Sequence, residues 1–539
     1  MSAHRHSASR ALLACVATLS LVAPALAACG DRAEEFETAM IVLPPVALGS
    51  TLVFVDSSVQ TAYVLDVARP ETAPRQVAVG RGASTVVRRN GHDEALVLCR
   101  GERGQVGVEP EASSLSVVSG AAGVAPVRYE LGSPFNAIAQ TSDGARAIVH
   151  FRTGEGLAGL LFNPNEIAIV DLAEPPSDTN PVRRTVRSFG GVPSAVFFSP
   201  PMALAGVPRT LAVILSDSYV TLIDVDHPDR SEITVPLALP EDLRAVLPVQ
   251  VLFDPDDPTI YVRAEASDDV FALRLQEMPA VAPSDNDFRP SLTQLAVGSR
   301  PNDMALFDAG EGKRLIVPSR ASRNVSIVDA RSSSVTTIGL DVPADRVLVF
   351  DAAAPGDPTI SARALLYAAD GATTATSFAD LVQIEERRGR NVETRSIGRP
   401  VVGALPLLTR GLMVLQHSSA TGAPGLSLLD LTARTSAPIY ADVPLENATF
   451  GAGATRIYVA PTYGVRLGFL DLATFVPGEV RLDATVSAVL PLADVPFVAI
   501  VHPSLAGHVT LLDARDPRRE SARSVEGFLL SDLLARGGE

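Results

Sequence analysis

A short apolar run that ends in an aspartate returns along the whole chain. Clear copies include "AYVLDVA", "EIAIVDL", "NVSIVDA" and "HVTLLDA". The final residue of the run is Asp66, Asp171, Asp224, Asp329, Asp430, Asp471 or Asp513, and weaker copies reach Ser119, Arg274 and Glu385. Successive positions lie 41 to 56 residues apart. A repeat of this length is typical of propellers and solenoids.

Each repeat shows the same plan of four short strands. Around Asp171, "FNAIAQ" and "ARAIVHF" are predicted strands joined by a tight turn, and "NEIAIVDL" and "RRTVRSF" follow after a Gly-rich loop. Runs of β-branched residues between Gly, Pro, Asp and Ser clusters are typical of strands and turns. Four strands per repeat match one blade of a propeller. We therefore expect an all-β chain, a β-propeller built from four-stranded blades.

The number of blades and the closure of the ring are less constrained. Ten repeats exceed the usual four to eight blades of a propeller. The chain could form one large ring, two smaller propellers, or fewer blades with some repeats merged, which gives about seven to ten units. No Pro-, Ser- or Gly-rich linker divides the chain, which favours one ring over residues 50–535. The first repeat, "STLVFVDSS", lacks an innermost strand in this interpretation. We therefore expect the C-terminal "SVEGFLLSDLLA" to add a strand to the first blade and close the ring.

The recurring aspartate has a structural interpretation. It ends the third strand of each repeat, just before a turn. A carboxylate in that place can accept hydrogen bonds from backbone N–H groups of the turn. Residues spread around a ring also cannot converge on one metal ion, so we expect these aspartates to stabilise turns.

The repeat from Val297 to Leu340 resembles the YVTN-type, WD40-like propeller repeat. That family shows V-G-x-x-P, a turn similar to "SPDG", then "YVTN" and "SNTVSVID". The matching residues here are Val297, Gly298, Pro301, Ile316, Val317, Asn324, Val325, Ile327, Val328 and Asp329. The turn "FDAGEG" and the segment "VPS" depart from the pattern. Lactonase-like and surface-antigen propellers share this repeat, so the resemblance, over roughly residues 50 to 525, implies a fold more than an activity.

The N-terminus has the pattern of a secretory signal. Arg5 and Arg10 precede an apolar run, and small residues lead to Cys29. "LAAC" resembles the bacterial lipobox, which implies cleavage after residue 28 and a diacylglycerol on the sulfur of Cys29. The alternatives are an ordinary Ala-x-Ala cut that leaves a free thiol, or an uncleaved anchor. We expect a signal peptide at residues 1–28 and a lipid-anchored tether at residues 29–49.

Lipidation at Cys29 would place the protein in the cell envelope. More than one acyl chain suffices for stable membrane attachment. In the sorting rule of enteric bacteria, Asp after the lipidated Cys retains a lipoprotein in the inner membrane. Gly30 therefore predicts an outer-membrane lipoprotein, facing either the periplasm or the cell surface.

Composition excludes some partners. A formal charge of −16 argues against a nucleic-acid partner, which requires a basic face. Once Cys15 leaves with the signal and Cys29 is acylated, only Cys99 remains, so no intramolecular disulfide is possible. We expect Cys99 to pack as a small buried residue.

Polar residues gather where the second strand of a repeat meets the third. The candidate ligand face comprises Arg100, His150, Arg152, Ser319, Arg320, Arg323, His417 and His502. The three histidines occupy equivalent strand ends, and imidazole is a common metal ligand, but their repeats are not all neighbours. We therefore expect no metal site. The arginines could instead meet a carboxylate or a phosphate, unless they are solvated loop charges.

No catalytic motif accompanies these residues. The sequence has no G-x-S-x-G elbow, H-E-x-x-H pair or P-loop. It has no Trp, so Trp-rich pyrroloquinoline propellers do not fit, and we expect no cofactor. The leading hypothesis is a non-enzymatic, lipid-anchored scaffold that binds a protein or an envelope ligand. The alternatives are a lactonase-like hydrolase, implied by the resemblance alone, and a purely structural envelope component.

Overall fold

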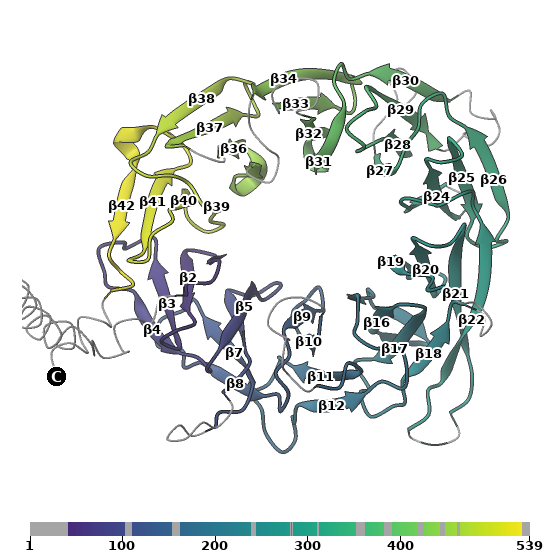
Figure 1. Ribbon diagram of the computed structural model, residues 1–539, viewed down its shortest axis with the longest axis horizontal. Coiled ribbons are helices and arrows are strands. Elements are labelled where there is room, and N and C mark those ends of the chain that lie inside the picture. The colour runs from purple at the N-terminus through teal and green to yellow at the C-terminus, as the bar shows by residue number, and fades with distance from the viewer. Residues whose placement is uncertain are drawn as a thin grey trace, which may run out of the picture.

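The chain forms one ring of ten four-stranded antiparallel sheets (Figure 1). The computed structural model describes residues 41–102, 110–152, 162–238, 244–280, 282, 284–309, 312–351, 362–381, 391–418, 425–441, 448–460 and 464–530. This arrangement confirms the prediction of an all-β propeller and decides the blade number as ten. Across these residues, no helix is long and apolar enough to cross a membrane.

The strands follow the chain blade by blade. Blade 1 contains β1 (Val46–Leu48), β2 (Thr51–Asp56), β3 (Thr61–Asp66) and β4 (Arg75–Ala78), and blade 2 contains β5 (Ala83–Arg88), β6 (Glu94–Cys99), β7 (Ser114–Ser119) and β8 (Val127–Glu130). Blade 3 contains β9 (Ala137–Gln140), β10 (Arg146–His150), β11 (Glu166–Asp171) and β12 (Arg183–Val186), and blade 4 contains β13 (Ala195–Phe198), β16 (Leu211–Ser216), β17 (Tyr219–Asp224) and β18 (Ile233–Pro236). Blade 5 contains β19 (Pro248–Asp254), β20 (Thr259–Ala264), β21 (Asp269–Glu277) and β22 (Phe288–Ala296). A hairpin of β14 (Met202–Leu204) and β15 (Val207–Arg209) is inserted into blade 4.

Blades 6 to 10 continue the same order. Blade 6 contains β23 (Ala305–Asp308), β24 (Lys313–Ser319), β25 (Asn324–Asp329) and β26 (Val335–Gly339), and blade 7 contains β27 (Arg346–Asp351), β28 (Ala362–Tyr367), β29 (Ala375–Asp380) and β30 (Val392–Ser396). Blade 8 contains β31 (Val401–Leu407), β32 (Leu412–His417), β33 (Gly425–Asp430) and β34 (Thr435–Ala441), and blade 9 contains β35 (Ala448–Phe450), β36 (Arg456–Val459), β37 (Arg466–Asp471) and β38 (Pro477–Arg481). Blade 10 contains β39 (Ala488–Pro491), β40 (Phe497–Val501), β41 (His508–Asp513) and β42 (Arg523–Glu526). Short 3-10 turns lie at η3 (Leu408–Arg410), η6 (Ala452–Ala454) and η7 (Arg519–Ser521).

Each blade runs outward from the centre of the ring. The first strand of a blade stands nearest the centre and the fourth lies on the outside (Figure 1). The second and third strands are apolar on both faces because a neighbouring blade covers each face. All six residues of β2 are buried, for example, whereas most of the outer strand β12 is exposed. Burying one large aliphatic side chain contributes about 1.5–3 kcal/mol, so these blade-to-blade contacts supply most of the stability.

The recurring aspartate closes a turn in seven blades. The Oδ1 atom of each accepts a hydrogen bond of 2.8–3.1 Å from the backbone N–H two residues later. Some of these carboxylates also face a basic residue on the second strand, as Asp171 faces Arg146 at 2.7 Å. The structural interpretation of the aspartate is thereby confirmed.

The seventh blade corrects one position in the repeat. The sequence pattern suggested "LVQIEER" with Glu385, a residue that lies outside the described ranges. The third strand is instead β29, and its Asp380 lies 2.9 Å from Nε of Arg363 on β28. The strand escaped the pattern because its buried positions include Thr376 and Ser377 in place of aliphatic residues.

The predicted closure by a C-terminal strand is wrong. The first blade has its own innermost strand, β1, and backbone bonds from Leu43 to Val55 and from Ser57 to Ile41 continue this pairing. The strand β42 pairs with β41 and stays within blade 10. The three-residue β1 lies between prolines and a glycine, too short for the sequence pattern to indicate a strand.

Side-chain packing closes the ring in place of strand exchange. Phe528, just after β42, packs edge-on against Phe54 of blade 1 with ring centroids 4.9 Å apart. Tyr63 of blade 1 and Leu511 of blade 10 belong to the same buried cluster. The next residue, Leu529, bonds back to the carbonyl of Ala506, which holds the segment against the seam.

Replacing Phe528 should weaken this seam. We expect Phe528→Ala to lower the free energy of unfolding by about 3–5 kcal/mol, because a large buried ring is lost and a cavity remains. Chemical denaturation followed by circular dichroism measures the change. The control is Phe475→Ala, because that ring is 53% exposed and its loss should cost little. Equal losses for both variants would show that Phe528 does not close the ring.

A variant of Asp329 tests the turn. Its Oδ1 accepts hydrogen bonds from the backbone N–H groups of Arg331 and Ser332, at 3.0 and 2.7 Å. Asp329→Ala should lower the free energy of unfolding by about 1–3 kcal/mol because these donors lose their acceptor. Asp329→Asn retains an acceptor oxygen and should lose less than half as much. The idea fails if urea denaturation shows equal losses for the two variants.

Candidate functional site

The eight candidate residues lie on five different blades. The prediction that the three histidines occupy equivalent strand ends is confirmed, because His150 and His417 end β10 and β32, and His502 follows β40. Arg100 belongs to blade 2, and Ser319, Arg320 and Arg323 belong to blade 6. The ring of ten blades (Figure 1) therefore distributes the candidates over blades 2, 3, 6, 8 and 10.

His417 and His502 make the same pair of hydrogen bonds in different blades. Nδ1 of His417 donates to the carbonyl of Pro400 at 3.3 Å, and Nε2 accepts from the Ser427 hydroxyl at 2.6 Å. Nδ1 of His502 donates to the carbonyl of Thr485 at 2.7 Å, and Nε2 accepts from the Thr510 hydroxyl at 2.8 Å. Each ring thus ties the segment between two blades to a third strand.

His150 is buried in a similar way. It is 4% exposed, and its Nδ1 donates to the carbonyl of Phe151 at 2.8 Å. Burial lowers the pKa of His150 to about 4, and the charges of Arg187 and Arg152 act in the same direction. Burial also lowers the pKa of His417 and of His502, so all three imidazoles are neutral at pH 7. Among the described residues, no group of three His, Cys, Asp or Glu side chains is placed to hold a metal ion.

Two of the three candidates of blade 6 make contacts with the segments on either side of that blade. Ser319 is fully buried and its hydroxyl donates to the carbonyl of Val297 at 3.3 Å. Arg320 lies 2.7 Å from Asp370 of the next blade. Arg323 is exposed and adopts a φ of 50° in the turn that follows β24. Of these three residues, only Arg323 presents its side chain to solvent without a role in the blade contact.

The candidates of blades 2 and 3 are held through their backbones. The N–H of Arg100 donates to the carbonyl of Gly82 at 3.1 Å. The N–H of Arg152 donates to Asn136 Oδ1 at 2.7 Å, and Asn136 Nδ2 donates back to the carbonyl of Arg152 at 2.9 Å. Cys99, beside Arg100, is a buried free thiol whose pKa is raised by burial to about 11, which confirms its expected packing role.

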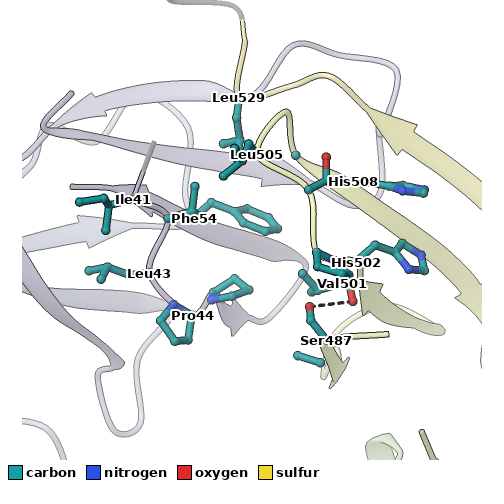
Figure 2. A pocket seen from close by; sticks show the side chains of 16 residues that line it. Ile41, Leu43, Pro44, Phe54, Ser487, Val501, His502, Leu505, His508 and Leu529 are labelled. Carbon is teal, nitrogen blue, oxygen red and sulfur yellow. Dashed lines mark hydrogen bonds between the residues drawn. The ribbon is translucent and has the colours of Figure 1, made fainter. Parts of the chain in front are cut away.

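A pocket that the sequence analysis missed lies at the seam between blades 10 and 1 (Figure 2). We call it the seam pocket, and its volume is about 730 Å³. Its walls are Ile41, Val42, Leu43, Pro44, Pro45, Phe54, Ser487, Ala488, Val501, His502, Pro503, Ser504, Leu505, Gly507, His508 and Leu529. These segments come from both ends of the described chain, so only closure of the ring creates the pocket.

The walls of the seam pocket are mostly apolar. Leu505 and Ile41 remain 62% and 57% exposed, although large aliphatic side chains usually favour burial. Several polar groups in the walls already have internal partners. The Ser487 hydroxyl donates to the carbonyl of Val501 at 2.9 Å (Figure 2), and both nitrogens of His502 are engaged.

His508 completes the polar side of the seam pocket. Its ring lies 4.2 Å from that of His502, measured between centroids. Its Nε2 lies 2.9 Å from the Ser524 hydroxyl and 3.4 Å from Glu526. This arrangement suits an apolar group, which is removed from water without competing for hydrogen bonds.

A second pocket, of about 570 Å³, lies beside His417 and is also lined by Ser427, Arg399 and Tyr440. A hydroxyl 2.6 Å from an imidazole has the distance of a nucleophile and its base. The same bond recurs in blade 10 between His502 and Thr510, away from this pocket. The repetition indicates a structural role for the pair, which joins the second and third strands of one blade.

Comparisons with known proteins show distant likenesses. No family model and no curated protein matches the sequence. Dihydro-heme d1 dehydrogenase NirN in complex with DHE is similar over 82% of this chain and 72% of its own, with 13% identity and a TM-score of 0.39. Kuenenia stuttgartiensis hydrazine synthase is similar over 56% and 92%, with 13% identity and a TM-score of 0.31. BBS1N in complex with ARL6DN is similar over 62% and 95%, with 12% identity and a TM-score of 0.30.

The buried histidine of blade 3 should make stability depend on pH. The native pKa of His150 is about 4, below the usual 6.5, so the unfolded chain binds more protons between these values. Stability should be complete above pH 6.5 and fall as the pH drops toward 4, by up to about 3 kcal/mol from this residue.

Denaturant unfolding at pH 7.5 and pH 4.5 measures this loss. We expect His150→Gln to show a smaller difference between the two pH values than the wild type, because Gln does not titrate. The exposed His92 provides the control variant His92→Gln, which should retain the wild-type difference. An unchanged pH dependence in His150→Gln would contradict the assignment.

Proposed function

We propose that the protein is a lipid-anchored propeller of the cell envelope that binds an apolar group of an envelope ligand or of a partner protein at the seam pocket. The observation that carries this proposal is the seam pocket itself, a concave apolar site with two half-exposed aliphatic side chains, Leu505 and Ile41, among its lining residues. Exposed apolar surface of this kind is typical of ligand and protein contacts.

The predicted anchor supports the same proposal. Cys29 lies outside the described residues, and acylation there would tether the chain to a membrane, for which Gly30 favours the outer membrane. Residues 41–45, which lie in the C-terminal part of the predicted tether, form one wall of the seam pocket. A ligand in the pocket would therefore be held close to the membrane surface.

The bonding of the candidate polar residues favours binding over catalysis of the lactonase type. A hydrolase requires an acid and a base that converge on one substrate position. His150, His417 and His502 belong to separate blades, and each bonds within the fold. The YVTN-type resemblance supports the propeller framework of this proposal and does not imply a reaction.

The anchor and the binding site can be tested together in envelope preparations. Mass analysis of the N-terminal peptide should find a lipid on Cys29. After crosslinking in intact cells, affinity capture of the wild type should recover a ligand or partner that Leu505→Glu loses at least tenfold, because a charge then enters the apolar wall. Leu408→Glu is the matched control, since Leu408 is 48% exposed on η3 of blade 8. Equal recovery by both variants, or recovery at background level in several detergents, would refute the proposal.

A further inference from the structure

We infer that the ligand of the seam pocket is the hydrocarbon chain of a single-chain lipid, such as a fatty acid. This inference rests on the proposed function and specifies the ligand class of the same site.

The lining selects hydrocarbon over a polar ligand. The wall is mostly apolar: it includes Leu43, Phe54, Val501, Leu505 and Leu529 (Figure 2), together with three prolines. The pocket volume of about 730 Å³ falls in the range of about 300–1,000 Å³ that suits small-molecule ligands. Aliphatic side chains contact a flexible chain along its length without requiring a fixed orientation.

The polar groups of the wall strengthen this choice. Both nitrogens of His502 and the hydroxyl of Ser487 are occupied by partners inside the fold. A sugar, nucleotide or peptide backbone that entered would lose its hydrogen bonds to water and find few replacements, which is costly. A methylene chain has no hydrogen bonds to water to lose, and the polar head of the lipid can stay in solvent at the mouth of the pocket.

The position of the site favours lipid as the source of the hydrocarbon. Ile41 lies twelve positions after Cys29, and a chain of that length spans at most about 43 Å when fully extended. The anchored pocket therefore stays within reach of a bilayer. A bilayer holds a single acyl chain only marginally, so a single-chain lipid exchanges readily, whereas several acyl chains on one residue stay inserted in the bilayer. A single-chain lipid thus gains most from the pocket, and the chains on Cys29 gain least.

A detergent-free titration tests the inference. The mature chain from residue 29 with Cys29→Ala carries no lipid of its own and is titrated with a fluorescent fatty acid. We expect saturable binding of one probe per chain, displaced by unlabelled palmitate. Leu505→Glu and Ile41→Glu should each weaken binding at least tenfold, and both positions are exposed enough to leave folding intact. Leu408→Glu should bind within twofold of the parent chain.

The acylated protein distinguishes the two possible sources of the chain. With the photoreactive residue p-benzoylphenylalanine in place of Leu505, illumination of cells should produce an adduct with a free single-chain lipid. An adduct within the chain to the lipid of Cys29, or to a protein, would overturn the inference. So would non-saturable probe binding, or binding that both glutamate variants retain. If the probe fails to bind but Leu505→Glu still loses a captured partner, the proposed function stands and only the ligand class is wrong.

Discussion

The contact between blade 10 and blade 1 is the interaction on which the ring depends. Every other blade contact joins neighbours in sequence, whereas this one joins the two ends of the described chain. No strand is exchanged across it, so Phe54, Phe528, Leu529 and the surrounding cluster hold it mainly by packing. Dispersion and apolar burial are non-directional, so this seam relies on close side-chain fit and on the backbone hydrogen bond from the N–H of Asp494 in blade 10 to the carbonyl of Gly49 in blade 1, at 3.3 Å.

The ring also explains what polar residues do at the ends of strands. A propeller brings the segment between two blades against the inner end of the following blade, where backbone carbonyls need donors. His417, His502 and Ser319 supply those donors from the last position of a second strand or from the position just after it. Residues that resemble a functional constellation in sequence are therefore part of the scaffold, and their burial keeps the histidines neutral.

Function is then expected where the repeat is interrupted. The seam is the place where the chain enters and leaves the ring, so its loops do not have to satisfy the same blade contacts as the others. The segment 41–45 and the loop around Leu505 lie there and enclose an apolar pocket. A site at the chain ends also lies beside the predicted anchor, which links binding and attachment in the proposals made for this protein.

Local sequence patterns predict the four-stranded repeat and the role of its aspartate, because short apolar strand runs and turn chemistry involve neighbouring residues. Asp171 and Asp329 bond to backbone groups two residues away, and such contacts can be inferred from neighbours in the chain. Only the folded chain shows the ten-bladed ring, the innermost strand β1, the seam pocket, and that Asp380 and not Glu385 occupies the repeat position of blade 7. The closure of the ring and the seam pocket depend on residues hundreds of positions apart, such as Phe54 and Phe528, whose contact leaves no periodic pattern in the sequence. The strand β1 is too short to match the repeat, and β29 carries Thr376 and Ser377 where the repeat has aliphatic residues.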